Sequence, residues 1–341
     1  KKKVIVIPIR YKIPLILNLF FFINLFFFIL KNKLDIKKIR KNYLSFIFKF
    51  IKTKKIFTFF ENTNRIQKLK KEFPQINFYT FINGTRVPNY EYIHDFFISW
   101  GQIDKEIDKK KKIYLSNKYY DLGSLRLLNY YQTKRGYKKE NDITYISSFA
   151  TVSKDNNWND KSDDIIRIHN SLKNYEKKIF RILNILKDKH NFKIKVLMKQ
   201  DVNSEDFEKE KEYLKLFFKA HEILIKKNNV DGYKFIEKSK ITISILSALG
   251  LEALSLNTKV LLGFPLIKLR REVNFWDLRS YAKYLKSEIS LKHISKEILY
   301  SKIQRLNKLE YQEYVNLIKV SRKHYSRIPN LKRFNRIIYE N

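Results

Sequence analysis

The sequence predicts an α/β protein with two doubly wound parallel sheets and a helical C-terminus. Short apolar runs alternate with helical segments along most of the chain, the pattern of parallel strands joined by crossover helices. A polar, charged stretch at residues 132–142 contains Gly136 and divides this alternation into two halves. At 341 residues, the chain is long enough to give each half its own core.

In the first half, the apolar run Val4–Ile9 is expected to open the first sheet. The later elements expected in this half are a basic helix over 37–52, a strand over 56–60, a helix over 65–71, and further strand-like and helical pieces to residue 128.

Residues 13–30 form a run of eighteen residues without a charge. The helix after the first strand of an α/β fold is largely buried, so the plain interpretation is a helix mostly covered by protein. The alternatives are a helix lying in a membrane interface and a helix that spans the membrane, which needs about 17 to 25 residues. Pro14, Asn18 and Asn24 interrupt the run and weigh against a span.

The second half repeats the alternation of strands and helices. The expected elements are a strand over 143–147, a helix over 175–190, a strand over 194–198, a helix over 208–228, a strand–helix–strand unit over 241–263, and helices near the C-terminus. We therefore place domain boundaries at 1–135 and 136–285, and expect residues 286–341 to be helices that pack back on the domains.

The strand–helix–strand unit carries the clearest chemical signal. A β-branched run ends in a turn of small residues with Ser244, Ser247 and Gly250, and a helix follows at once. Free N–H groups at a helix N-terminus attract phosphate, so Ser244, Ser247, Leu249 and Gly250 are candidate binding residues. We expect a Cβ at Gly250 to crowd the phosphate and leave the fold intact. The alternative is an ordinary helix cap with a packing glycine.

Ligands in doubly wound sheets bind outside the carboxyl ends of the strands, so residues that follow other apolar runs are also candidates. They are Ser147 and Ser148, Lys199 as a partner for phosphate, and Glu252 as an acceptor for ribose or sugar hydroxyls. The alternative for Lys199 is an ordinary exposed side chain. The alternative for Glu252 is an acidic residue in the first turn of a helix that complements the helix dipole.

Other candidates lie outside this unit. His94 and Asp95 precede the apolar run 96–100 and are weak candidates for a general base from the first half. Trp276 and Arg279 are candidates for closing over the ligand, although a core tryptophan is the commoner explanation. No cluster of metal-ligating residues stands out, which favours a metal-independent reaction in which N–H groups and Lys199 stabilise the leaving phosphate.

The composition excludes some classes of protein and leaves others open. The chain has no cysteine, so disulfides, thiolate zinc sites and cysteine nucleophiles are excluded. The formal charge of +37 taken alone points to nucleic acid or an anionic membrane. Lys, Asn, Ile, Phe and Tyr, all abundant here, have A/T-rich codons, so genome bias is the simpler explanation.

Several segments together resemble one known family. They are 4–9, Phe97–Gly101, Leu122–Leu128, Tyr145–Phe149, the turn at 244–252 and Asn274–Ser280. In this order they resemble GT-B-type glycosyltransferases, and most closely bacterial surface carbohydrate (lipopolysaccharide or capsule) biosynthesis proteins. The chain departs from the family pattern at Leu125, usually proline, and at Ile245, commonly aspartate or another polar residue. The resemblance implies two Rossmann-like domains, an acceptor-side domain at 1–135 and a nucleotide-sugar donor domain at 136–285.

The resemblance implies a glycosyltransferase that moves a sugar from a nucleotide-activated donor, a substrate and not a cofactor, to a surface polysaccharide or lipid-linked acceptor. The implied location is the cytoplasm, with peripheral attachment to the anionic inner face of the membrane. Two alternatives stay in the same architecture, a sugar-nucleotide epimerase and a polyol-phosphate transferase. A basic RNA-binding or ribosomal protein is a more remote alternative, because the ordered strand–helix–strand pattern argues against nucleic acid as the partner.

Overall fold

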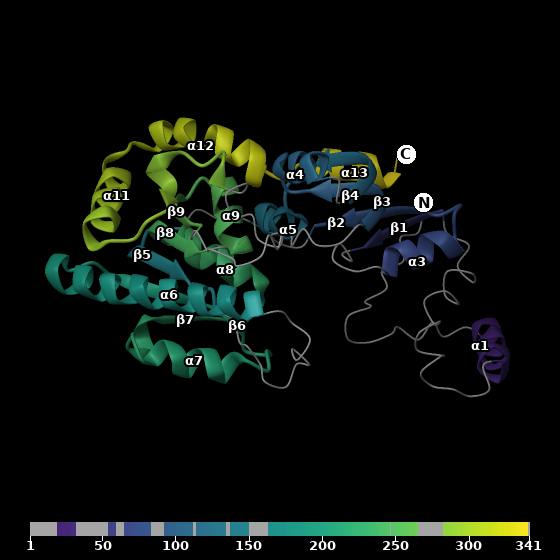
Figure 1. Cartoon of the computed structure of the whole chain (residues 1–341), viewed down its shortest axis with the longest axis horizontal. Helices are drawn as coiled ribbons and strands as arrows, with labels where there is room; N and C mark the ends of the chain where they lie inside the picture. The colour runs from purple at the N-terminus through teal and green to yellow at the C-terminus, as the bar shows by residue number, and fades with distance from the viewer. Residues whose placement is uncertain are drawn as a thin grey trace.

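Two parallel β-sheets with helices packed beside them make up the computed structural model of this chain (Figure 1). The structure describes residues 19–31, 54–58, 65–82, 92–111, 114–133, 137–149, 163–245, 247–264 and 282–339. The opening run 4–9 and the expected basic helix 37–52 lie outside these residues.

The smaller sheet has the strand order β1-β2-β3-β4, and every neighbouring pair is parallel. Its core includes the aromatic residues Tyr79 and Phe81, which contact Phe57 across the strands. The elements of this part are β1 (Lys55–Thr58), α3 (Arg65–Glu72), β2 (Asn77–Phe81), β3 (Tyr92–Ser99), α4 (Ile103–Lys111), β4 (Tyr114–Asp121) and α5 (Leu125–Thr133).

The larger sheet is also parallel and has the order β10-β9-β8-β5-β6-β7. Its central strands are buried on both faces, which is why they appear in the sequence as nearly continuous β-branched and aliphatic runs. Its strands are β5 (Asn141–Ile146), β6 (Ile194–Asp201), β7 (Ile223–Lys226), β8 (Ser239–Ile245), β9 (Lys259–Gly263) and β10 (Ser290–Leu291).

Helices connect these strands and cover the sheet. Asn228 begins α8 by accepting hydrogen bonds from the N–H groups of Val230 and Asp231. Ser295 begins α11 by accepting from the N–H of Ile298. The helical elements are α6 (Asp163–His190), α7 (Phe207–Lys215), α8 (Asn229–Glu237), α9 (Ala248–Ser255) and α11 (Lys296–Lys308), with short 3₁₀ turns η2 (Ala220–Glu222) and η4 (Ser287–Ile289).

The C-terminal helices return the chain to the smaller sheet (Figure 1). Helix α12 (Tyr311–Tyr325) packs against α9, and the N–H of Arg327 then donates to the carbonyl of Trp100 at 2.8 Å. Helix α13 (Leu331–Tyr339) buries Phe334 and Ile337 in the core of the smaller sheet. The last helices therefore join the two sheets.

The predicted fold class is confirmed, and the architecture is two parallel sheets with interleaved helices. The single helix predicted over 208–228 is wrong, because this stretch contains α7, η2 and β7, and α8 begins directly after it. The run Ile223–Lys226 is too short to distinguish a strand from a helical turn by periodicity, so tertiary pairing with β6 decides its state.

The apolar segment in residues 13–30 is described in part. Residues 19–31 form helix α1 (Leu19–Lys31), and its described side chains are exposed or half-buried. Residues 13–18 and the side chains at 19–22, 24 and 25 lie outside the described part, so a helix mostly covered by protein stays a prediction. Within the described part of the chain, no helix has the length and apolar character needed to cross a bilayer.

Candidate functional site

The order of the larger sheet locates the candidate site. Successive strands are added in one direction from β5 to β7 and in the other from β8 to β10, so the direction of winding reverses between β5 and β8. Crevices that bind ligands in such sheets form at this reversal, outside the carboxyl ends of the strands. Because β6, β5 and β8 are parallel neighbours, the loops that follow them all leave at the same edge.

A buried glutamate holds the loop after β5. Glu176, from α6, is 2% exposed and accepts hydrogen bonds from the N–H and hydroxyl of Ser148 at 2.7 and 2.9 Å. The hydroxyl of Tyr145 also donates to it, at 3.1 Å. Burial raises the pKa of Glu176. Ser147 is fully buried, and its hydroxyl accepts from the N–H of Phe149, so this loop is fixed by protein contacts.

A second buried glutamate holds the last residues of β6. The strand runs to Asp201, so Lys199 lies inside it, whereas the predicted strand over 194–198 implied that Lys199 follows it. The two carboxylate oxygens of Glu210, from α7, accept the N–H groups of Lys199 and Gln200 at 2.8 and 2.7 Å. The ammonium of Lys199 donates to the carbonyl of Phe149 at 3.0 Å, which connects the end of β6 to the loop after β5. Nothing in the sequence pattern marks Glu176 or Glu210, because each holds the backbone of another element.

Lys226, at the end of β7, brings a second ammonium to this edge. Its Nζ donates to the carbonyl of Lys199. Loss of hydration on burial lowers the pKa of both lysines, and the nearby charges of Glu210 oppose the shift. Arg126 of α5 is also close enough to lower the pKa of Lys226. The edge therefore holds cations from both halves of the chain, beside the carboxylates of Glu210 and Glu252.

The carboxylate of Glu252 joins the two halves. It is 1% exposed, accepts a hydrogen bond from the Ser124 hydroxyl, and lies 3.5 Å from the guanidinium of Arg126. Arg126 also lies over the ring of Trp100, at 5.6 Å from its centroid. The role expected for Glu252, as an acceptor for ribose or sugar hydroxyls, thus competes with protein partners for the same oxygens.

Helix α9 begins at this edge with Ser247 as its N-cap residue. Ser247 is half-buried and makes no side-chain capping bond, so it leaves the first-turn N–H groups to other partners. Leu249 is half-buried and lies beside Gly232 of α8. The N-terminus of α9 is consistent with anion binding, but by itself it does not define a site.

Gly250 has a packing role that contradicts one expectation. A Cβ at this position would overlap both the Cβ and the hydroxyl of Ser244, which is fully buried in β8. A larger residue at 250 is therefore expected to disturb the packing of helix on strand, and the expectation of an intact fold was wrong. Within the described residues, the Ser244 hydroxyl has no hydrogen-bond partner and faces the protein interior.

The two general-base candidates from the first half, Asp95 and His94, lie in β3, and only the side chain of Asp95 is described. Asp95 lies inside β3, is 8% exposed, accepts the N–H of Phe78 at 2.9 Å, and pairs with Lys70 at 3.0 Å. Phe78 is near the amino end of β2, so this carboxylate lies away from the carboxyl edge, and its contacts are structural. His94 lies in β3, with its side chain outside the described part; Trp276 and Arg279 lie outside the described residues.

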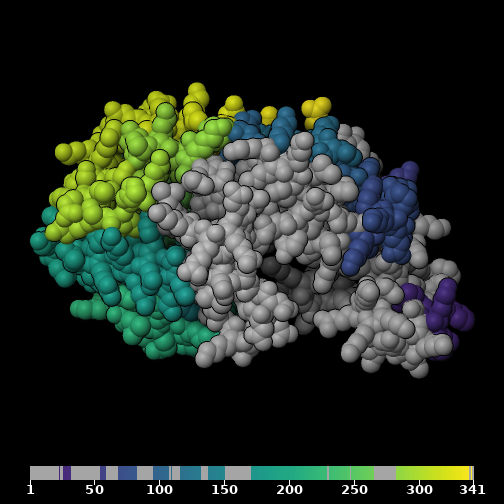
Figure 2. Space-filling model, viewed as in Figure 1, coloured from purple at the N-terminus to yellow at the C-terminus, as the bar shows by residue number. Residues whose placement is uncertain are grey.

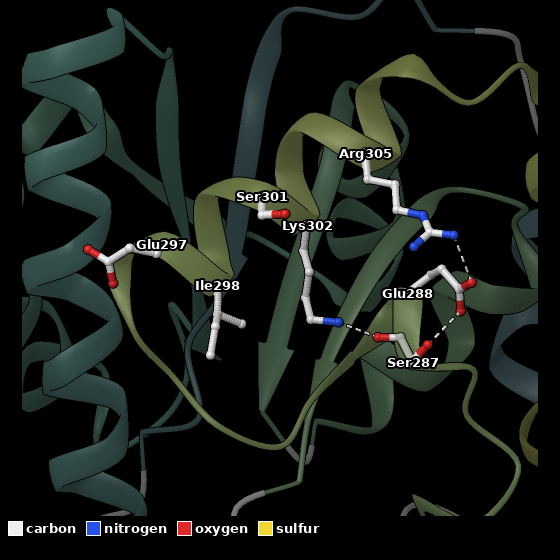
Figure 3. Close-up of a pocket in the computed structure, with 7 residues that line it drawn as sticks. All are labelled: Ser287, Glu288, Glu297, Ile298, Ser301, Lys302 and Arg305. Carbon is white, nitrogen blue, oxygen red and sulfur yellow. Dashed lines mark hydrogen bonds and ion pairs between the residues drawn. The ribbon is translucent and has the colours of Figure 1, made fainter.

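A separate hollow of about 360 Å³ lies beside η4 and α11 (Figure 3). Its cations already have partners, because Lys302 donates to the carbonyl of Ser287 and Arg305 lies 3.0 Å from Glu288. Ser287 precedes β10, so the hollow is at the amino end of that strand, away from the candidate site. Among the described residues, no group of three or more His, Asp or Glu is arranged to hold a metal ion.

Comparison with known proteins identifies the family. The model of the family described as "putative O-antigen biosynthesis protein" matches residues 80–285, which are 206 of the 341 residues. The chain belongs to this family. The O-antigen family match covers parts of both sheets, including β3 and the whole of α9. The predicted resemblance to surface carbohydrate biosynthesis proteins of the GT-B type is thereby confirmed.

Solved structures agree on the fold of this O-antigen family chain. The structure of a protein described as a "putative UDP-N-acetylglucosamine 2-epimerase" from Listeria monocytogenes matches with a TM-score of 0.53 and 10% identity, over 88% of this chain and 78% of that one. The UDP-GlcNAc 2-epimerase of Methanocaldococcus jannaschii, in complex with UDP-GlcNAc and UDP, matches with a TM-score of 0.52 and 12% identity, over 86% and 78%. No curated protein matches significantly.

Proposed function

We propose that this protein is a glycosyltransferase that moves a sugar from a nucleotide-activated donor to a surface polysaccharide or lipid-linked acceptor, without a metal ion. Membership of the O-antigen family supports surface carbohydrate as the product class. In this proposal, residues 136–285 bind the donor and residues 1–135 face the acceptor. The proposed product is lipopolysaccharide or capsule. The proposed location of the reaction is the inner face of the cytoplasmic membrane.

The observation that carries the proposal is the convergence of cations at the edge where the larger sheet reverses direction. Lys199 and Lys226 reach this edge from β6 and β7, and α9 begins beside it with an N-terminus that Ser247 does not cap. A nucleoside diphosphate is negatively charged, so its phosphate oxygens can accept hydrogen bonds from both the ammonium groups and the N–H groups at the start of α9. The Methanocaldococcus jannaschii epimerase, which shares the fold, binds UDP-GlcNAc and UDP.

The proposed chemistry is stabilisation of a leaving nucleotide diphosphate. As the acceptor hydroxyl bonds to the anomeric carbon of the sugar, the bond from that carbon to the donor phosphate breaks. Negative charge develops on the phosphate oxygens, and fixed N–H groups and ammonium groups lower the energy of that state. Ser148 and Lys199 are held in place by Glu176 and Glu210, so little reorganisation is needed during reaction. Trp276 and Arg279 remain proposed donor contacts.

Two assays test the proposal. The purified chain is incubated with a panel of nucleotide sugars and a lipid-linked oligosaccharide acceptor, with and without EDTA. Free nucleotide together with an acceptor heavier by one sugar is the expected outcome, and it should survive EDTA. If NMR instead shows conversion of the nucleotide sugar to its epimer without release of nucleotide, the protein is a sugar-nucleotide epimerase, one of the two alternatives in the same architecture.

Binding is tested on the site itself. Alanine at Lys199 or Lys226 should lower nucleotide affinity by roughly ten- to a hundred-fold each, the value of one charge-assisted contact of about 1.5 to 3 kcal/mol. Lys209→Ala is the matched control, because Lys209 is exposed on α7 and pairs only with Asp206 among the described ion pairs. If Lys199→Ala and Lys226→Ala bind the nucleotide as tightly as Lys209→Ala and the unchanged protein do, this edge is not the donor site.

A further inference from the structure

Helix α1 presents a continuous apolar stripe to solvent. Ile23, Phe26, Phe27 and Leu30 are 45%, 58%, 64% and 48% exposed. These positions are spaced i, i+3, i+4 and i+7, so their side chains lie on one face of the helix. Phe26 and Phe27 contact each other edge to face. Scattered exposed apolar residues are ordinary, but an apolar stripe along a helix indicates a surface that something covers.

The described protein does not cover this stripe. Helix α1 lies apart from both sheets in Figure 1, and Figure 2 shows its atoms, in purple, at the edge of the molecule. None of the three described core clusters includes a residue of α1. In the sequence of α1, LFFFINLFFFILK, the polar residues are Asn24 and Lys31. Burial of such apolar side chains away from water is favourable, so the helix gains stability where an apolar medium covers it.

The charge next to α1 indicates which partner covers it. Residues 31–55 contain ten Lys and Arg residues and one acidic residue, Asp35. Lys31, at the end of the helix, is exposed. An apolar helix followed at once by a basic segment is the combination that binds an anionic bilayer surface, where apolar side chains enter the lipid and basic residues meet the head groups.

From these observations we infer that α1 is a membrane-docking helix that inserts its apolar stripe into the surface of an anionic lipid bilayer. The described helix has 13 residues, about 20 Å at the α-helical rise. The proposal places α1 in the interface, and among the described helices none is long and apolar enough to cross a bilayer. A second copy of the chain fits less well, because pairing two α1 helices would bring two basic segments of the same sign together in a protein of charge +37.

Vesicle flotation tests this docking. The full chain is mixed with vesicles of phosphatidylcholine alone or with 30% phosphatidylglycerol, a fraction of about one third chosen to give a strong negative surface potential. We expect flotation with the anionic vesicles, little with the neutral ones, and partial release at about 1 M salt, where the Debye length falls to about 3 Å. Phe26→Ser/Phe27→Ser should lower the vesicle partition coefficient about tenfold or more.

The matched control is Leu216→Ser/Val320→Ser, which removes two exposed apolar side chains from the larger half, 75% and 45% exposed. It should float as the unchanged protein does. Circular dichroism checks that each variant is folded. Flotation that survives Phe26→Ser/Phe27→Ser would overturn the inference, as would self-association in sedimentation velocity that this variant abolishes while vesicles bind nothing. Docking and nucleotide binding are separate measurements, so either proposal can fail alone.

Discussion

At the scale of single residues, the contact between Gly250 and Ser244 sets how closely α9 approaches β8. Ser244 is fully buried in a strand, so its Cβ cannot move aside by changing rotamer. Any side chain at 250 must therefore push the helix away from the sheet. This matters for the site, because Gly250 lies in the first turn of α9, whose N-terminus faces the carboxyl edge of the sheet.

We predict that Gly250→Ala lowers the free energy of unfolding by about 3 kcal/mol, the upper end of overpacking costs in a dense core. Adding Ser244→Gly removes the atoms that the new Cβ would meet and should restore part of this loss. Urea denaturation of the two single variants and the double variant measures the coupling. Additive losses in the double variant would show that Ser244 is not the residue that excludes a side chain.

The depressed pKa values of Lys199 and Lys226 predict how nucleotide binding responds to pH. Burial disfavours the charged form, so each ammonium loses its proton at a pH below 10.5, the ordinary lysine pKa. Affinity for a nucleoside diphosphate should therefore fall as pH rises through the lowered pKa. Isothermal titration with UDP between pH 7 and 10 measures it.

Lys199→Arg is the control for this pH dependence, because a guanidinium stays charged over the whole range. The fall in affinity should be smaller in this variant. An identical decline in Lys199→Arg and the unchanged protein would show that Lys199 does not titrate against the phosphate.

At the scale of elements, α7 acts as a support for the carboxyl end of β6. Glu210, fully buried, faces the sheet and accepts two backbone N–H groups, whereas Glu208, two residues earlier, faces solvent and pairs with Lys211. The same helix thus carries one carboxylate that holds the backbone of another element, Glu210, and one that makes only an exposed ion pair, Glu208.

Glu210→Ala should lower the free energy of unfolding by about 2 to 4 kcal/mol, because it leaves two N–H groups without their acceptor. It should also weaken nucleotide binding, since the backbone of Lys199 loses its anchor. Glu208→Ala is the matched control and should change stability by at most about 1 kcal/mol, the value of an exposed ion pair. Thermal and urea unfolding measure the free energy of unfolding of both variants. A similar loss of stability in Glu210→Ala and Glu208→Ala would refute the supporting role of α7.

At the scale of the whole molecule, the two sheets are joined where α12 ends. Gly101, after β3, lies directly against the backbone carbonyl of His324, and the N–H of Gln102 donates to the carbonyl of Lys323. Arg327 adds an ion pair with Asp121 at 2.8 Å. Polar pairs across the same junction include the hydroxyl of Tyr284 with Glu106. These contacts make the relative position of the sheets depend on a close backbone approach.

Gly101→Ala should disrupt this junction, because its Cβ would overlap backbone atoms that no rotamer change can move. We expect a loss of about 3 kcal/mol or more and a broadened or divided transition in scanning calorimetry, as the two sheets unfold less cooperatively. Gly232→Ala is the control: its Cβ would meet the end of the flexible Leu249 side chain at 3.0 Å, so the change should stay within about 1 kcal/mol. A single sharp transition at the original temperature in Gly101→Ala would contradict this account.

The sequence by itself determined the fold class and the family. Strands of a parallel sheet are buried on both faces, so β8 and β9 appear directly as apolar runs, and the small-residue turn between them marks the start of α9. Lys199 and Ser148 follow such runs, and the parallel direction of β5 and β6 places both residues near one edge of the sheet. Elements whose pattern was ambiguous, β7 above all, needed their neighbours to decide their state.

Only the tertiary structure decided what the site residues contact. Glu252 meets Ser124 across 128 positions of sequence, and Glu176 meets Ser148 across 28, so no local pattern encodes either pairing. It also decided that Gly250 fits against a strand and that α1 remains uncovered by the described protein. The physical reason is the same in each case: periodicity reports which face of an element is apolar, whereas the partner on that face depends on how distant segments pack.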